Sequence, residues 1–166
     1  MRNENNMLIQ LCYASRRVEH QNDLLQDLSD ILAQARSFNE AHQIYGVLYY
    51  AEGIYFQCLE GEQAQLEALF ASIRKDPRHT EIHRFQDHMI DQVHFSRWSM
   101  KYVNQHGKVR QFFDKQGLNA FLPHELNAVS IQSFLELLLK LNDADEKDQK
   151  VQVKKGLNHR GYQNFF

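Results

Sequence analysis

The stretch that decides the fold is Ile54-Tyr55-Phe56-Gln57-Cys58-Leu59-Glu60-Gly61-Glu62. Its first six residues are mostly β-formers with one amide, Gln57, in the middle, which predicts a strand. Alternation along a strand puts Tyr55, Gln57 and Leu59 on one face. An unpaired buried amide costs about 1–3 kcal/mol, so Gln57 must bond to a side chain, a water or a ligand. This stretch alone favours a side chain or water.

Further strands are expected on both sides of this stretch. The expected ranges are 8–14, 44–50, 54–59 and 81–85, with a fifth strand formed by Phe95 and 98–103. The segment 51–53, which contains Gly53, is typical of a hairpin loop. Both faces of these strands carry apolar side chains, which predicts a sheet that is covered on both sides.

Two helices alternate with these strands. The first should begin near Asn22 or Asp23, both good N-caps, and end near Asn39, whose simplest role is capping. The second should open at 61–62 and stop at 76–77, because a residue before proline avoids the helical region. Apolar stripes are formed by Leu24, Leu25, Leu28, Ile31, Leu32 and Ala35 in the first helix and by Leu66, Leu69, Phe70 and Ile73 in the second.

The element order β-α-β-β-α-β, followed by one more strand, is that of a ferredoxin-like fold. We therefore expect an α+β domain over 1–103, with a five-stranded mixed sheet and two helices on one face. Residues 104–142 are expected to form a C-terminal helical pair that covers the other face. Residues 143–166 are polar and basic. A mobile solvated tail is the simpler interpretation, and a basic docking segment is the alternative.

Composition narrows the class of protein. The chain has 166 residues, enough for one domain with a core, and its formal net charge of -2 argues against nucleic-acid binding by the whole chain. Cys12 and Cys58 lie in apolar strand-like runs, which suits reduced thiols in the cytoplasm better than disulfides or a metal cluster. The sequence shows no signal peptide and no apolar stretch of the length that spans a membrane.

Common enzyme motifs are missing from the sequence. Gly-x-Gly-x-x-Gly, the P-loop, Gly-x-Ser-x-Gly and Cys-x-x-Cys do not occur. His79 and His83 have the spacing of a metal pair on a helix. They fall where a strand should begin, so this spacing does not make them neighbours, and we expect no metal site.

What remains is a set of hydrogen-bonding groups at the ends of elements. The set comprises Tyr13, Asn39, Gln57, Arg78, His79, Ser99 and Met100. A groove between the two helices would have Ile31 and Ile73 as walls, with the tyrosine and the glutamine as floor. A flat aromatic ring with amide-like edges would fit this slot. Asn39 could bond that edge, and Arg78 could meet a ribityl or phosphate oxygen.

Six separated blocks stand out along residues 8–103. They are Leu11-Cys12-Tyr13-Ala14-Ser15-Arg16, Ala35-Arg36-Ser37-Phe38-Asn39, Gly46-Val47-Leu48-Tyr49-Tyr50, Phe56-Gln57-Cys58-Leu59-Glu60-Gly61, Asp76-Pro77-Arg78-His79 and Phe95-Ser96-Arg97-Trp98-Ser99-Met100. In identity and spacing they resemble the BLUF family of flavin-binding blue-light sensors. The likeness is to short BLUF regulators, which carry two C-terminal helices and no output enzyme. Two departures are Phe38, where many members have a polar flavin contact, and 93–95, which replaces a commonly basic stretch.

The resemblance implies a cofactor and a mechanism. The cofactor would be FAD, with FMN or riboflavin as alternatives. Light would move an electron and a proton from Tyr13 to the flavin and let the Gln57 amide rearrange, giving a small reversible red shift without net reaction. The implied cofactor contacts are Tyr13, Ser15, Ile31, Asn39, Gln57, Ile73, Asp76, Arg78 and His79, and the implied photoactive residues are Tyr13, Gln57, Trp98 and Met100.

The resemblance also implies a sensor that acts on a protein partner, expected to be a transcription regulator, rather than an enzyme. A changed Gln57 bond would alter which of Trp98 or Met100 packs inward, and so the grip of the last strand on the C-terminal helices. A homo-oligomer is left open, and direct nucleic-acid binding is not expected. Two alternatives are a flavin oxidoreductase, for which the chain lacks a nicotinamide motif, and a cofactor-free ferredoxin-like interaction module.

Overall fold

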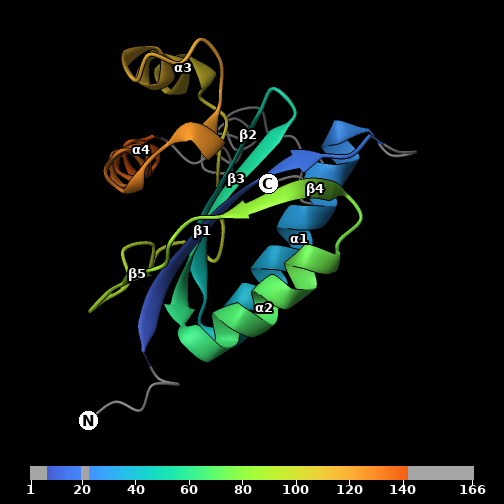
Figure 1. Cartoon of the computed structure of the whole chain (residues 1–166). Helices are drawn as coiled ribbons and strands as arrows, with labels where there is room; N and C mark the ends of the chain where they lie inside the picture. Colours follow the sequence, from blue (N-terminus) through green and yellow to red (C-terminus); the bar gives the residue numbers. More distant parts are fainter. Residues whose placement is uncertain (1–6, 20–22, 142–166) are drawn as a thin grey trace, which may run out of the picture.

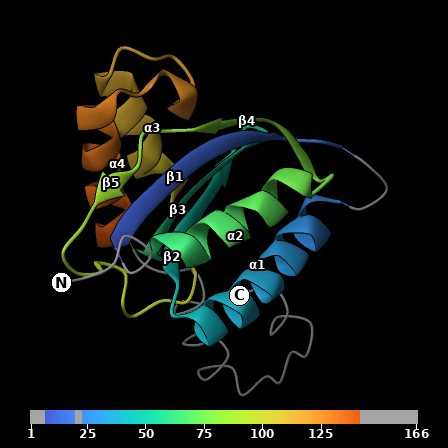
Figure 2. The same ribbon diagram turned by 60° about the horizontal axis from the view of Figure 1, so that its bottom comes forward.

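The computed structural model describes residues 7–19 and 23–141. A mixed sheet lies between two pairs of helices, α1 with α2 and α3 with α4 (Figure 1, Figure 2). The strands are β1 (Leu8–Arg17), β2 (Tyr45–Ala51), β3 (Ile54–Glu62), β4 (His79–Arg84), β5 (His88–Met89) and β6 (Lys101–Val103), and the helices are α1 (Leu24–His42), α2 (Gln63–Lys75), α3 (His106–Lys115) and α4 (Ala128–Lys140). The predicted α+β ferredoxin-like fold is confirmed. The predicted tail, 143–166, lies outside the described residues, and the predicted domain boundaries stay predictions.

The sheet is built around β1 and β3, which pair antiparallel at its centre. Its order is β4-β1-β3-β2-β6, and the two-residue β5 also pairs with β1, so the sheet has six strands instead of the predicted five. Only the pairing of β2 with β6 is parallel among these strands of the described chain. In the central pair, Tyr13 lies opposite Gln57 and Cys12 lies opposite Cys58.

The hairpin between β2 and β3 is tighter than the sequence suggests. Ala51 pairs with Ile54, so the loop is only Glu52 and Gly53. Their φ angles are 52° and 80°. Two successive left-handed residues are the mark of a type I′ turn, whose twist matches that of the strands it joins.

Helix α1 begins as predicted but ends later. The Asp23 side chain accepts a hydrogen bond from the backbone N–H of Gln26, so this residue is the N-cap. The helix continues to His42, and Gln43 ends it in the left-handed conformation. The prediction that Asn39 caps the helix end is therefore wrong. Asn39 lies inside the last turn, and its side chain is available for other bonds.

The last strand is shorter than predicted. It begins at Lys101, while Trp98, Ser99 and Met100 are irregular. The reason is local: the N–H of Trp98 turns back to the carbonyl of Phe95, and side chains from α1 bind the carbonyls of Ser99 and Met100. These side-chain bonds replace the regular ladder of a strand.

Candidate functional site

A cavity of about 770 Å³ lies between α1 and α2, over the sheet. It brings together eight of the nine predicted cofactor contacts, namely Tyr13, Ile31, Asn39, Gln57, Ile73, Asp76, Arg78 and His79. This volume lies within the range of about 300–1,000 Å³ that is typical of small-molecule sites. The site residues, far apart in sequence, therefore line one cavity.

The floor of the cavity carries a hydrogen-bonded pair from the two central strands. The Tyr13 hydroxyl donates to Gln57 Oε1 at 2.5 Å. On its other side, Gln57 Nε2 donates to Met100 Sδ at 3.7 Å, which is a weak bond because a thioether is a poor acceptor. The Gln57 amide is therefore fixed firmly through its oxygen and only loosely through its nitrogen.

Burial controls the protonation of this pair. Burial away from water raises the pKa of Tyr13 above its ordinary value, and the negative charge of Asp76 and the nearby Tyr55 raise it further. The Tyr13 hydroxyl therefore keeps its proton at neutral pH and acts as the donor.

Asn39 supplies an acceptor with no partner. Its Nδ2 donates to the carbonyl of Ser99 at 2.7 Å, whereas its buried Oδ1 has no hydrogen-bond partner. A buried carbonyl oxygen that stays unpaired costs about 1–3 kcal/mol. An N–H donor from a ligand in the cavity would remove this cost.

Charged residues that follow α2 line one end of the cavity. Arg78 Nε donates to both carboxylate oxygens of Asp76, at 2.9 and 3.0 Å, and Arg78 Nη2 also donates to Gln34 Oε1. Burial favours a higher pKa for Asp76, but the hydrogen bonds from Arg78 prevail and lower it. The ion pair therefore holds the guanidinium at the mouth of the cavity.

Ser15 is the one predicted contact that does not line the cavity. Its hydroxyl lies 2.7 Å from His79 Nδ1, while His79 Nε2 lies 2.6 Å from the carbonyl of Ile73. Ser15 therefore helps to hold the ring of His79 in place without lining the cavity itself.

These groups fit a flavin. The edge of an isoalloxazine ring presents an N–H donor beside carbonyl acceptors. The free Asn39 Oδ1 suits the donor, and the loosely held Gln57 amide nitrogen suits an acceptor. Ile31 and Ile73, on opposite helices, offer apolar walls for the flat faces of the ring. Among the described residues, no group of three His, Cys, Asp or Glu side chains could hold a metal ion.

The family model described as BLUF, sensors of blue-light using FAD, matches residues 8–101. The chain belongs to the BLUF family. This BLUF chain is 48% identical to BlsA in its photo-activated state, with a TM-score of 0.80, and the match covers 83% of this chain and 99% of that one. BlrB, a BLUF protein in its dark state, is 31% identical with a TM-score of 0.60, over 67% of this chain and 82% of that chain.

Larger BLUF proteins also match. The photoactivated adenylate cyclase subunit beta of Euglena longa is 41% identical over 56 residues, which are 34% of this chain but 6% of the cyclase. The chain therefore spans less than a tenth of that relative's length. The match concerns the light-sensing unit rather than the cyclase activity named for the whole protein.

The structure separates the two candidate photoactive residues near β6. Met100 is buried in the cluster formed with α1 and α2, on the cavity side of the sheet. Trp98 packs against the opposite cluster, with Lys101 Nζ 4.3 Å from the centre of its ring. In this BLUF domain, Met100 therefore packs toward Gln57 and Trp98 packs away.

Sequence reasoning missed several lining residues. They include Ala33, Gln34, Ala35, Ser37, Phe38, Ala41, His42, Leu48, Tyr55, Leu69 and Ser72. The apolar stripe of the second helix already includes Leu69, one turn before Ile73, although the sequence analysis did not place it in the cavity. Phe38, the departure from the family pattern, lines the cavity and stacks on His42 at 3.9 Å between ring centres. The two residues are four apart in α1, a spacing that makes helical side chains neighbours, but the predicted helix ended near Asn39 and so left His42 out.

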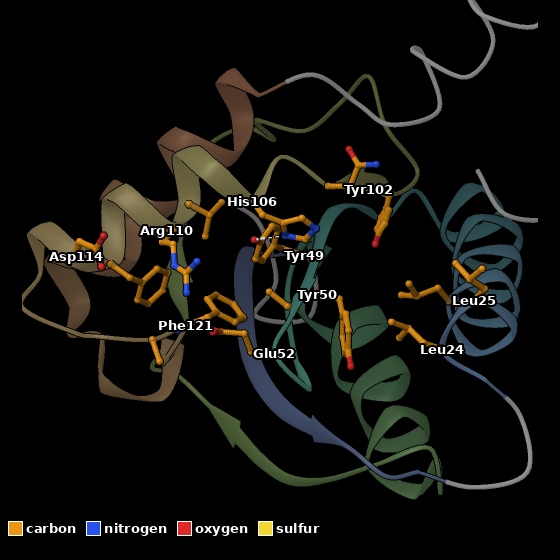
Figure 3. A pocket seen from close by; sticks show the side chains of 16 residues that line it. Leu24, Leu25, Tyr49, Tyr50, Glu52, Tyr102, His106, Arg110, Asp114 and Phe121 are labelled. Atoms are coloured by element: carbon orange, nitrogen blue, oxygen red, sulfur yellow. Dashed lines mark hydrogen bonds between the residues drawn. The ribbon is translucent and has the colours of Figure 1, made fainter.

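A second cavity of about 530 Å³ lies away from Gln57, between the start of α1, the end of β2 and α3 (Figure 3). Tyr49 and His106 meet at its floor, with the Tyr49 hydroxyl 2.8 Å from His106 Nδ1. Burial, together with Tyr50, raises the pKa of Tyr102 on another wall to about 12. This cavity is lined by residues of both α1 and α3.

Within residues 7–19 and 23–141, no helix has the length and apolar character needed to cross a membrane.

Proposed function

We propose that this chain is a cytoplasmic blue-light receptor that binds FAD and signals to a protein partner through the Tyr13–Gln57 hydrogen bond. The observation that carries the proposal is the 2.5 Å bond between these side chains on the cavity floor, beside the unpaired Oδ1 of Asn39. The family description supports FAD. FMN is the alternative, because a related Klebsiella pneumoniae BlrP1 structure is described with FMN. The free thiols of Cys12 and Cys58 suit a reducing cytoplasm.

The bound flavin supplies the absorption of blue light and an excited state that accepts an electron. Tyr13 would be the electron donor and its hydroxyl proton has a direct acceptor in Gln57; both the electron and the proton would return to Tyr13 when the charges recombine. The Gln57 amide then rearranges by rotation, tautomerisation or both. In a rotation Nε2 would face Tyr13 and Oε1 would face Met100, so the tyrosine would become an acceptor and the bond to sulfur would be lost.

The signal leaves the site through the segment before β6. Asn39 binds the carbonyl of Ser99, and Arg36 Nη2 binds the carbonyl of Met100 at 3.2 Å. One residue further, Lys101 Nζ donates to the carbonyl of Leu139 in α4 at 3.0 Å. These contacts support a mechanical link from Gln57 to the C-terminal helices, on which a transcription regulator would dock as the partner.

The first experiment is an absorption spectrum of the flavin-loaded protein in the dark, in blue light and after dark recovery. We expect the flavin bands to shift slightly to the red and to return. Tyr13→Phe and Gln57→Leu should each abolish the shift. The control is Tyr49→Phe, which removes a hydroxyl on the other side of the sheet and should retain the shift. Bleaching to reduced flavin would favour an oxidoreductase, and an unchanged spectrum would contradict the proposal.

A further inference from the structure

Strand β3 carries a second buried polar side chain, Glu60, that the proposed photochemistry does not use. Glu60 is three positions after Gln57, and an odd separation along a strand puts two side chains on opposite faces. Glu60 is 0% exposed, on the side of the sheet that faces away from the cavity. A carboxylate in this position requires a structural explanation, because an unpaired buried charge is strongly unfavourable.

Four donors compensate the Glu60 carboxylate. Its Oε1 accepts from the backbone N–H groups of His94 and Phe95, at 2.5 and 2.9 Å. Its Oε2 lies 2.7 Å from His94 Nδ1 and accepts from Gln10 Nε2 at 3.1 Å. Hydrogen bonds to the charged form stabilise it. Glu60 therefore ties the start of the 94–100 segment to β1 and β3.

The same network reaches helix α4. Gln10 lies opposite Glu60 in the antiparallel register, and its Oε1 accepts from Gln132 Nε2 at 3.0 Å. The Gln10 amide therefore has one favourable orientation, with its nitrogen toward Glu60 and its oxygen toward Gln132. A flip of that amide would place its oxygen against the Glu60 carboxylate, where two acceptors would face each other.

The other end of the 94–100 segment meets the cavity. Asn39 binds the carbonyl of Ser99, and Gln57 donates to the sulfur of Met100. One short segment is thus held between the cavity side chains at its end and Glu60 at its start. A displacement of Met100 would reach the two backbone donors that hold the Glu60 carboxylate only along the 94–100 segment.

We propose that Glu60 is a positioning residue that transmits the light response from the 94–100 segment to the first half of α4, through Gln10 and Gln132. The inference rests on the proposed function, because it needs a Gln57 that changes its bond to Met100 in light. It goes further by naming a route separate from Lys101, which contacts the last turn of α4. A coupling of this kind transmits only the free-energy difference between the two states of the segment.

The test combines the flavin spectrum with hydrogen exchange of the full-length, flavin-loaded protein in the dark and in blue light. The variant is Gln132→Met, which keeps a long unbranched side chain and removes the donor to Gln10. The matched control is Ser133→Ala, which changes the next residue, exposed on the same helix and bonded only within it. A second variant, Gln10→Met, breaks the same chain from β1.

We expect the unmodified protein to show the red shift and a light-induced change in exchange at residues 131–135. In Gln132→Met and Gln10→Met, the red shift should persist while that change falls about fivefold, which corresponds to one hydrogen bond. Ser133→Ala should keep both. An undiminished change in the two variants, with unaltered dark exchange of α4, overturns the relay and leaves the photochemistry standing. Absence of the red shift in the unmodified protein overturns the proposed function, and the relay with it.

Discussion

The two faces of the sheet are built from the same strands but are filled differently. On the α3/α4 face, aromatic rings pack against one another over the central strands, with Phe134 centred 4.9 Å from Phe56 and 5.3 Å from Phe113, and the second cavity lies at the edge of this cluster, beside Tyr49 and Phe113. On the α1/α2 face, a cavity of about 770 Å³ remains. Small side chains explain the difference, because the lining of the cavity includes Ala33, Ala35, Ser37, Ala41 and Ser72. The comparison shows that small residues on the helices can leave room for a ligand over one face of a sheet whose other face is packed with aromatic rings.

The largest expected effect on stability comes from truncating a core side chain on the α3/α4 face. Phe134 is fully buried among aromatic rings. Phe134→Ala should lower the free energy of unfolding by about 3–5 kcal/mol, because it removes apolar contacts and leaves a cavity. Urea unfolding followed by circular dichroism measures this loss. The exposed neighbour Ser133→Ala should stay within about 0.5 kcal/mol. A loss below 1 kcal/mol for Phe134→Ala would mean that the aromatic cluster is not the core of that face.

An intermediate effect is expected from introducing a larger side chain on each face of the sheet. Val47 is fully buried on the α3/α4 face, and Val47→Phe should cost about 1–3 kcal/mol of unfolding free energy through overpacking. Ala35 lines the cavity. Ala35→Phe should therefore be close to neutral for the stability of the flavin-free protein, yet weaken flavin binding at least tenfold. Unfolding curves and fluorescence titration with FAD measure the two quantities. Equal destabilisation by both variants would contradict the contrast between the faces.

The smallest effect is a dependence on alkaline pH shared by both faces. Burial raises the pKa of Tyr13 on the cavity face and of Tyr49 on the other. The folded chain then keeps protons that the unfolded chain loses, so the stabilisation is complete below the unfolded pKa of 10.0 and falls as the pH rises above it. The slope should reach about 1.4 kcal/mol per pH unit for each tyrosine.

Urea unfolding at pH 9, 10 and 11 measures this slope. Tyr13→Phe and Tyr49→Phe should each remove one share of it. A Tyr13 variant that leaves the slope unchanged, beside a Tyr49 variant that reduces it, would show that the tyrosine on the cavity face titrates as an exposed one.

Much of the fold follows from local patterns in the sequence. The alternation around Gln57 and the N-cap at Asp23 predict elements that the structure contains. The end of α1 and the start of β6 were misplaced. The start of β6 was misplaced because side chains from α1 bind the carbonyls of Ser99 and Met100, about 60 positions away, and α1 itself ends only at Gln43 in the left-handed conformation. Local periodicity carries no information about such a bond.

The candidate site, like the fold, was only partly predictable from the sequence. Its apolar walls, Ile31 and Ile73, follow from helical stripes, and its main polar groups follow from their places at the ends of elements, whereas Ser15 and Asp76 came from the family resemblance alone. Nothing in the sequence indicates that Ser15 would lie behind His79, or that Met100 rather than Trp98 would pack toward the cavity. These choices depend on how the 94–100 segment is anchored at both ends.

The sulfur of Met100 sets how easily the Gln57 amide can change. Because a thioether accepts only weakly, releasing the amide nitrogen costs less than breaking a bond to an oxygen would. Two amide orientations can then lie close in free energy, so a modest input is enough to reverse their populations. An oxygen acceptor at this position would deepen the dark-state minimum and make the receptor less sensitive. In the proposed light response, the weak bond to the methionine sulfur would be the one that the Gln57 amide gives up when it rotates.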